Sequence, residues 1–346
     1  MLKEKIRSGY YLSWIFSACF SLLLFAIAWF WIHPSTEVQF HGILFSNLSI
    51  APFDFSTENP ARYRFLSPVI AHAIGLSGKL FYIFPWIMMI AFMTLVQRFS
   101  LLGSIPMYVG FIKVTLLSFS FMLFLCLAGP GYVDSVSWLL LMICLLPGLN
   151  RIVFVTCLLL VLLNHESSIF AFPGLLLWRY RELPYKKVLQ QSLFDLLPVI
   201  ILYAIFRWTI SELTSVRYDF SFYLNRENII GNIYTNFPLL IKGTFYSFRF
   251  AWIFPLLAVS STIVNKEYRM MMIFLLMIVI PFFQLMIAYD FTRLLALCFP
   301  AIVLAFDYLY KQYAFRVVWL GLIIIILNLF LPLFIIGKDT FVKIIG

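Results

Sequence analysis

Charged side chains are scarce in this chain: Asp, Glu, Lys and Arg make up 12% of its 346 residues, whereas 63% of the residues are hydrophobic. A soluble domain carries about 25% charged residues. One globular core cannot enclose so much apolar side chain, so the composition excludes a soluble globular protein and indicates that lipid is the solvent. We therefore expect an all-α fold, a polytopic transmembrane helical protein in which residues 1–346 form a single membrane domain.

Several binding motifs are also missing. No basic run with interleaved aromatic residues occurs, so the net charge of +10 is assigned to residues that flank membrane spans, and nucleic acid is not expected as a partner. The five cysteines fall inside apolar runs without metal-ligand spacing and are interpreted as small core residues. His165-Glu166 is followed by Ser-Ser-Ile and lacks the second histidine of a zinc motif. No internal repeat of the kind found in inverted-repeat transporters is visible.

The chain does contain a series of hydrophobic runs, which predict eleven spans. The first, residues 11–32, follows basic residues and is long enough for about 33 Å of helix. Because signal-peptide cores are only roughly 7–15 residues long, this run is interpreted as an uncleaved signal-anchor with a cytoplasmic N-terminus. Residues 65–76 are too short to cross and are expected to form an interfacial or re-entrant helix after the first outer loop, residues 33–64. The other expected spans are residues 80–96, 107–128, 133–146, 152–163, 169–178, 192–208, 251–264, 270–288, 294–310 and 317–336.

The distribution of charge sets the expected topology. Every expected inner segment carries Lys or Arg, as the positive-inside rule requires, and residues 179–187 form the most basic of these segments. Most acidic residues fall in the expected outer segments, and a second long outer loop is expected at residues 211–248. We expect a multi-pass integral protein that contacts membrane lipids. Asp195 and Asp307, near inner ends of spans, are expected to be structural.

Ionisable residues at the expected outer face form the candidate site, because charges at membrane depth are costly and are functional hypotheses by default. Carboxylates can deprotonate a hydroxyl or hold a divalent cation, and arginines bind phosphate through a bidentate fork. Sugar transfer from a lipid phosphate donor requires carboxylates and arginines together at the entrance of one active site. The candidates are Asp54, Glu58, Arg62, Arg64, Asp134, His165, Glu166, Asp290 and Arg293, with the basic residues Arg217, Arg226, Lys242 and Arg249 of the second outer loop beside them.

Each of these candidates also has a purely structural interpretation. The alternatives are loop solvation for Asp54 and Glu58, anchoring at the lipid interface for Arg62 and Arg64, helix capping for Asp134, a helix N-terminal charge for Glu166, and mutual pairing for Asp290 and Arg293. The sequence leaves these alternatives open.

The polar turns resemble those of a known family. The signal-anchor, the acidic outer loop and the stretch Arg-Tyr-Arg-Phe-Leu-Ser-Pro (residues 62–68) are similar to bacterial members of the GT-C superfamily. Gly-Tyr-Val-Asp-Ser (131–135), Asn-His-Glu-Ser-Ser (164–168) and Asp-Phe-Thr-Arg (290–293) also resemble polar turns in such proteins. The resemblance implies a GT-C-like fold and an integral membrane glycosyltransferase that takes a sugar from a polyprenyl-phosphate-linked donor. The acceptor would be a lipid-linked or glycan molecule on the outer face, in polysaccharide biosynthesis of the cell envelope.

The resemblance also implies roles for individual residues. Asp54 would be the catalytic base that takes the proton of the acceptor hydroxyl, with Glu58 as the second choice. The phosphate of the donor would be neutralised by Arg62, Arg64 and Arg293, and the sugar or acceptor would be bound or oriented by Asp134, His165, Glu166 and Asp290. The first outer loop has no adjacent Asp-Asp, Asp-Glu or Glu-Asp pair, so metal dependence stays open, with Mg or Mn as the candidate divalent cofactor.

Two other functions stay open at this point. An O-antigen-polymerase-like enzyme would also use arginines of outer loops, and residues 211–248 are long enough to supply them. A transporter or flippase of lipid-linked saccharides should instead carry Gly/Pro-broken spans with charges near mid-membrane. Because the charges of this chain cluster at one expected face, the sequence favours an enzyme.

Overall fold

The chain is almost entirely helical. The structure, a computed structural model, describes residues 2–34, 41–56, 59–214, 229, 237–286, 290–336 and 341–345. Helix accounts for 82% of it, which confirms the all-α class expected from the sequence. The described residues also contain two antiparallel strands, β1 (Leu333–Ile336) and β2 (Phe341–Ile345). The last apolar run therefore ends its helix at Phe330 and continues into β1, although residues 317–336 were expected to form one span.

The helices follow one another with short connections. In chain order they are α1 (Leu2–Ile32), α2 (His41–Ile50), η1 (Pro60–Tyr63), α3 (Leu66–Ala73), η2 (Gly78–Leu80), α4 (Ile83–Leu102), α5 (Met107–Ser118), α6 (Phe121–Ala128), α7 (Asp134–Cys144), α8 (Arg151–Asn164), η3 (Glu166–Ala171), α9 (Phe172–Arg179), α10 (Tyr185–Leu213), α13 (Phe237–Phe248), η4 (Arg249–Trp252), α14 (Ile253–Val264), α15 (Tyr268–Phe283), η5 (Gln284–Met286), α16 (Phe291–Leu295), η6 (Ala296–Cys298), α17 (Phe299–Tyr313) and α18 (Phe315–Phe330).

Six stretches of the described chain are long and apolar enough to cross a membrane. They are Leu12–Ile32, Gly78–Leu102, Tyr185–Leu213, Phe237–Val264, Tyr268–Met286 and Phe291–Tyr313. The helices α5 and α6 are bent by 53° at their junction and make a seventh span when counted together. By the length and composition of these helices, the chain is an integral multi-pass membrane protein.

Eleven spans were expected, but only six or seven stretches of the described chain are long enough to cross a membrane. The expected spans at residues 133–146 and 152–163 form α7 and α8, which have 11 and 14 residues. At about 1.5 Å per residue these helices extend roughly 17–21 Å, short of the ~30 Å hydrocarbon core. The sequence explains the shortness of α7, because Pro147-Gly148 follow it within a few residues and interrupt the helix.

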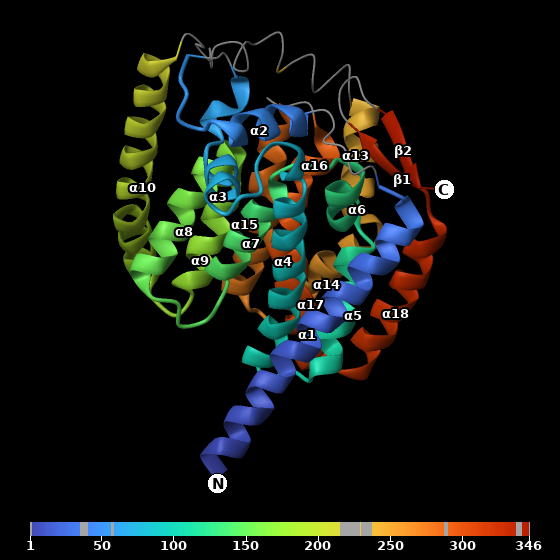
Figure 1. Ribbon diagram of the computed structural model, residues 1–346. Helices are drawn as coiled ribbons and strands as arrows, with labels where there is room; N and C mark the ends of the chain where they lie inside the picture. The colour runs from blue at the N-terminus through green and yellow to red at the C-terminus, as the bar shows by residue number, and fades with distance from the viewer. Residues whose placement is uncertain are drawn as a thin grey trace.

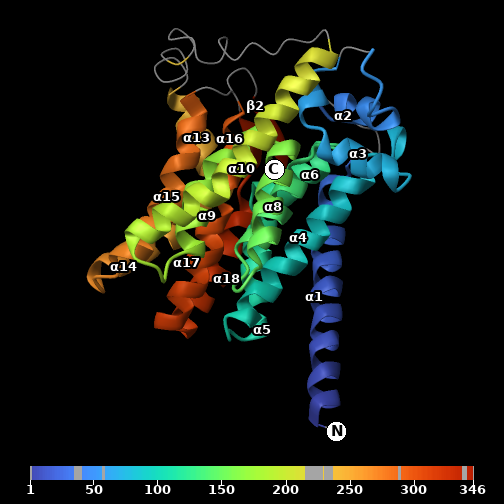
Figure 2. The same ribbon diagram turned by 90° about the vertical axis from the view of Figure 1, so that its left-hand side faces the viewer.

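Two short helices lie across one end of the bundle, which we call the α2–α3 end. Figure 1 shows α2 nearly perpendicular to α4, and the view in Figure 2 shows the same for α3. The beginning of α1 projects beyond the opposite end (Figure 2). The helix expected at residues 65–76 is therefore present as α3, and it lies crosswise to the long helices, as an interfacial helix would.

Close helix packing and buried hydrogen bonds hold the bundle together. The helix α4 packs against α1, α5 and α7. A Cβ atom on Gly110 of α5 would lie 2.7 Å from the carbonyl oxygen of Gln97 on α4, so only glycine allows this approach. The Gln97 side chain donates a 2.8 Å hydrogen bond to Ser21 of α1, which is the kind of polar contact that joins helices in lipid. Four of the five cysteines are buried as expected, but Cys19 is exposed on α1.

The start of α8 and the basic segment at residues 179–187, which connects α9 to α10, lie at the end opposite to α2 and α3 (Figure 1). The guanidinium of Arg151, at the start of α8, donates to Asp195 at 2.6 Å, and the hydroxyl of Tyr180 donates to the other oxygen of that carboxylate. Inside the bundle, the ammonium of Lys113 on α5 lies 2.8 Å from both carboxylate oxygens of Asp307 on α17. Both aspartates are thus held in ion pairs between helices.

Candidate functional site

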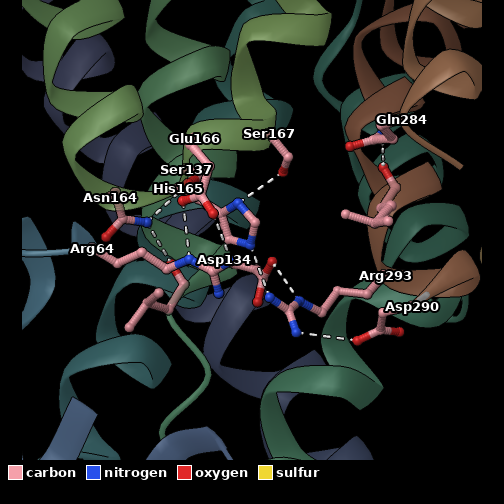
Figure 3. A network of polar contacts seen from close by, with 12 residues as sticks. Arg64, Asp134, Ser137, Asn164, His165, Glu166, Ser167, Gln284, Asp290 and Arg293 are labelled. Atoms are coloured by element: carbon pink, nitrogen blue, oxygen red, sulfur yellow. Dashed lines mark hydrogen bonds and ion pairs between the residues drawn. The ribbon is translucent and has the colours of Figure 1, made fainter. Parts of the chain in front are cut away.

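Four segments that are far apart in the sequence meet in one polar network next to α3 (Figure 3). Arg64 lies between η1 and α3, and Asp134 is the first residue of α7. His165 and Glu166 form the junction between α8 and η3. Arg293 belongs to α16. Most of the turns that were expected to meet at one face are therefore joined by direct contacts.

The local sequence explains why the α8–η3 junction is a turn. His165 has extended backbone angles, φ −158° and ψ 113°, which end the helix α8 at Asn164. The chain then makes the 3₁₀ turns of η3, and Pro173 in the first turn of α9 fits the start of a new helix. Glu166 is thereby placed at the beginning of η3, where a negative charge is favourable.

Arg64 and Glu166 form the more accessible half of the network. The Nε and Nη2 atoms of Arg64 donate to the two oxygens of Glu166 at 3.1 and 2.9 Å, a bidentate pair. Their side chains are 26% and 31% exposed. Burial by itself would raise the pKa of Glu166, but the Arg64 guanidinium outweighs burial and holds the pKa of this carboxyl well below its ordinary value.

Arg293 is the centre of the buried half of the network. Its Nε donates to Asp134 at 3.0 Å and its Nη1 donates to Asp290 at 3.1 Å. Its guanidinium carbon also lies 5.0 Å from the ring centre of Tyr132. The side chains of Arg293 and Asp134 are only 7% and 10% exposed. Asp290 and Arg293 do pair with each other, as the structural alternative supposed, but Asp134 bonds to Arg293 instead of capping its own helix.

The same arginine defines the protonation state of His165. The Nη2 atom of Arg293 lies 2.8 Å from Nε2 of His165, and a guanidinium can only donate. Nε2 must therefore accept, so the ring is neutral with its proton on Nδ1, which donates to the hydroxyl of Ser167 at 2.7 Å. Burial and the charge of Arg64 lower the pKa of His165 to about 3, consistent with a neutral ring. His165 consequently cannot take a proton from Ser167, which excludes a serine–histidine nucleophile of the protease type.

This histidine predicts a dependence of stability on pH. The unfolded chain protonates it below about pH 6.5, whereas the folded protein keeps it neutral until about pH 3. The free energy of unfolding should therefore fall as the pH is lowered from 6.5 to 5, by about 2 kcal/mol for this single group. The measurement is the melting temperature of the purified protein at pH 7 and pH 5, a range above the ordinary pKa of glutamate. In His165→Gln the fall should be smaller by this amount, and an unchanged fall would contradict the assignment.

The other predicted site residues lie outside these contacts. Asp54 is exposed, and its carboxylate accepts hydrogen bonds from the backbone N–H and hydroxyl of Ser56 at 3.0 and 2.6 Å. These hydrogen bonds keep the pKa of Asp54 below its ordinary value. Arg62 is 2% exposed and faces the ring of Phe55 at 5.1 Å, so it is not a side chain that extends to the lipid interface. Glu58 lies outside the described residues, as do Arg217 and Arg226.

Two side chains that directly contact Arg293 or His165 were not singled out from the sequence. Tyr132 and Ser167 lie within the polar turns that drew attention, next to residues that were chosen. Their position in these turns was the only feature of the sequence that could have identified them as site residues. For a divalent cation, the described residues contain no group of three or more His, Cys, Asp or Glu side chains placed to bind one. The use of Mg or Mn stays a prediction.

The fold and the site together define the class of this protein. It is a multi-pass helical membrane protein with a partly buried network of arginines, carboxylates and one neutral histidine near one end of its bundle. Comparison with known proteins finds no match to any family model, curated protein or solved structure. The functional argument therefore depends on the geometry of the network.

Proposed function

We propose that the protein is a membrane glycosyltransferase that moves a sugar from a polyprenyl-phosphate donor to a lipid-linked or glycan acceptor. The observation that supports the proposal is the polar network itself. Arginines and carboxylates from four distant segments gather at one end of a membrane-spanning bundle, beside the crosswise helix α3. A lipid phosphate needs a cation at the membrane surface, and carboxylates beside that cation can accept hydrogen bonds from the hydroxyls of the sugar.

Arg64 is the residue best placed to bind the donor phosphate. Its bonds to Glu166 occupy two of the five N–H groups of a guanidinium. The other N–H groups have no partner among the described residues, and 26% of the side chain is accessible. Arg293 is already bonded to Asp134, Asp290 and His165, so we assign it to shaping the site and to balancing charge.

The carboxylates divide into two kinds. Glu166 and Asp134 each bond to an arginine, and we assign them to orienting the sugar or the acceptor. Asp54 has no ion pair within hydrogen-bonding distance among the described residues and is exposed, so we keep it as the proposed base. An exposed carboxylate can meet an acceptor that arrives from water, whereas both oxygens of Glu166 and one oxygen of Asp134 already accept hydrogen bonds from a guanidinium.

The finer topology belongs to the same proposal. We assign the α2–α3 end to the outer face of a bacterial inner membrane and the basic end to the cytoplasm, with the N-terminus inside. In this arrangement the shorter helices α7, α8, α9 and α18 complete a GT-C-like membrane domain of eleven passes. The hydrogen bonds within α7 and α8 satisfy their backbone, which lipid demands of any crossing segment.

The experiment is a donor-binding and transfer assay with matched arginine variants. The purified protein is placed in proteoliposomes with a radiolabelled polyprenyl-phosphate-linked hexose, and release of polyprenyl phosphate is followed with binding. Arg64→Ala should weaken donor binding about 10–100-fold, as expected for the loss of charge-assisted hydrogen bonds. Arg181→Ala is the control, because Arg181 stacks on Trp178 at the opposite end of the bundle. Equal binding by both variants would argue against the phosphate site.

One observation favours a transporter as the second candidate. Lys113 is fully buried with Asp307 inside the bundle, and the hydroxyl of Ser100 donates to the same carboxylate at 3.0 Å. Ion pairs at this depth often mark a path for ions or substrates. The same proteoliposomes separate the two functions, since a transporter moves the intact lipid-linked saccharide across the membrane without releasing polyprenyl phosphate. The polymerase-like alternative depends on residues 211–248, most of which lie outside the described residues.

A further inference from the structure

The amide of Asn164 connects three of the four segments that carry the network. Its Nδ2 donates to the carbonyl oxygen of Val133 at 2.9 Å and to the hydroxyl of Ser137 at 2.8 Å. Its Oδ1 accepts a hydrogen bond from the hydroxyl of Ser67. Asn164 and Ser67 are completely buried, and Ser137 is 2% exposed. No charged group takes part in these bonds, so Asn164 was not a candidate from the sequence.

Each partner of Asn164 is close in the chain to a charged residue of the network. Val133 immediately precedes Asp134, and Ser67 follows Arg64 by three residues at the start of α3. Asn164 itself immediately precedes His165 and Glu166. The amide thus determines the distances between three backbone segments. Charged side chains of these segments then pair with one another: Arg64 bonds to Glu166, and Arg293 bridges His165 and Asp134 (Figure 3).

We propose that Asn164 is a positioning residue of the candidate site, which sets His165 and Glu166 in register with Asp134 and Arg64. Arg293 requires Nε2 of His165 and Oδ1 of Asp134 at 2.8 and 3.0 Å from its own nitrogens. A shift of the α8–η3 junction by about an ångström would break one of these bonds, because hydrogen bonds weaken steeply with distance and angle. The role in sugar transfer rests on the proposed function, but the positioning itself does not.

The chemistry of the contacts explains why an amide occupies this position. The carbonyl oxygen of Val133 can only accept, so the group facing it must be the NH₂ of the amide, and the oxygen must face Ser67. Aspartate at position 164 would place an acceptor against the carbonyl oxygen of Val133. A leucine of similar size would leave Ser67 and Val133 with unsatisfied buried groups. Asparagine supplies both a donor pair and an acceptor in one short side chain.

The test reads the state of His165 directly and needs no knowledge of the substrate. The full-length protein is labelled with ¹⁵N-histidine and placed in nanodiscs, and ring-nitrogen chemical shifts report which nitrogen carries the proton. The chain has four histidines, so the signals of His165 are identified by their loss in His165→Gln. The groups that face this ring are Arg64, Glu166, Arg293, Asp134 and Ser167.

The expected result is a change at His165 that depends on the Asn164 contacts. At pH 5.5 the wild-type ring should be neutral with its proton on Nδ1, whereas in Asn164→Ala the Nε2 signal should shift and the two neutral tautomers should mix, because the bond from Arg293 that selects one tautomer is lost. Ser137→Ala, a milder change, should shift the same signals partway. Its control is Ser135→Ala, which removes a buried hydrogen bond to Pro85 from the same helix α7 without touching Asn164.

Two outcomes would overturn the proposal. The first is a His165 spectrum that stays unchanged in Asn164→Ala and Ser137→Ala while the melting temperature falls. The second is an equal spectral change in Ser137→Ala and Ser135→Ala, which would show a general loosening of α7. If the wild-type protein has no transferase activity but Asn164→Ala still shifts the His165 signals, the positioning role is supported and the proposed function is refuted. The two claims can therefore fail separately.

Discussion

Arg293→Met is expected to destabilise the folded protein by about 3–5 kcal/mol, the cost of leaving a buried charge without its partner. Arg293 balances the carboxylate of Asp134, whose side chain is only 10% exposed, and it also bonds to Asp290 and His165. Methionine keeps much of the volume but supplies no donor. The melting temperature in detergent, measured with and without added lipid, would show this effect as a large decrease.

A double variant separates the loss of charge balance from the loss of packing. Adding Asp134→Asn to Arg293→Met removes the uncompensated charge, so the double variant should be more stable than Arg293→Met alone. Arg181→Met is the matched control, because its partner Glu182 is 85% exposed and an exposed pair contributes only about 0–1 kcal/mol. If Arg293→Met is no less stable than Arg181→Met, Asp134 is not held as an ion in the folded protein.

Asp54→Asn is expected to lower the rate of sugar transfer by about 10²–10⁴ and to leave donor binding intact. The amide keeps the shape of the side chain and one oxygen that can accept from Ser56, so the local turn should survive. It cannot take the proton of an acceptor hydroxyl. The measurement is single-turnover transfer from a labelled polyprenyl-phosphate sugar, together with the equilibrium affinity for the same donor.

The control for this change is Glu182→Gln, the same conversion of a carboxylate to an amide at an exposed position on the opposite end. It should retain full activity. Wild-type turnover in Asp54→Asn together with an inactive Asp134→Asn variant would assign the base to the buried network. Wild-type turnover in both variants would remove the carboxylate mechanism and favour the transporter.

The contrast between Arg64 and Asp54 shows what could be predicted about the site. Both were chosen from one polar stretch, because charges are rare in an apolar chain and therefore conspicuous. The structure gives Arg64 a bidentate partner 102 residues away, whereas the carboxylate of Asp54 bonds only to its neighbour Ser56 among the described residues. Spacing along the chain carried no information about that difference, because it depends on which helix ends come together.

Helix length illustrates the same division for the fold. Hydrophobic runs predicted the presence of α1, α4 and α10, since a long uninterrupted apolar run can only form a helix in lipid. The helix α10 nevertheless begins at Tyr185, seven residues before the expected span at residues 192–208. The runs at residues 133–146 and 152–163 are only 14 and 12 residues long in the sequence, and they form helices of 11 and 14 residues. Their polar ends are drawn into contacts with other segments, as Asp134 is with Arg293 and Asn164 is with Ser67. Those contacts are decided by tertiary packing.

The sequence by itself determined that this is a helical protein of the membrane, because composition and hydrophobic run length act locally, and it singled out a few ionisable residues as candidates for a site. Only the tertiary structure decided the pairing of those residues. A neutral His165 follows from an arginine 128 residues away, and the placement of its turn follows from a buried asparagine without any charge. Burial and distance set the energy of a polar group, and both are properties of the packed chain.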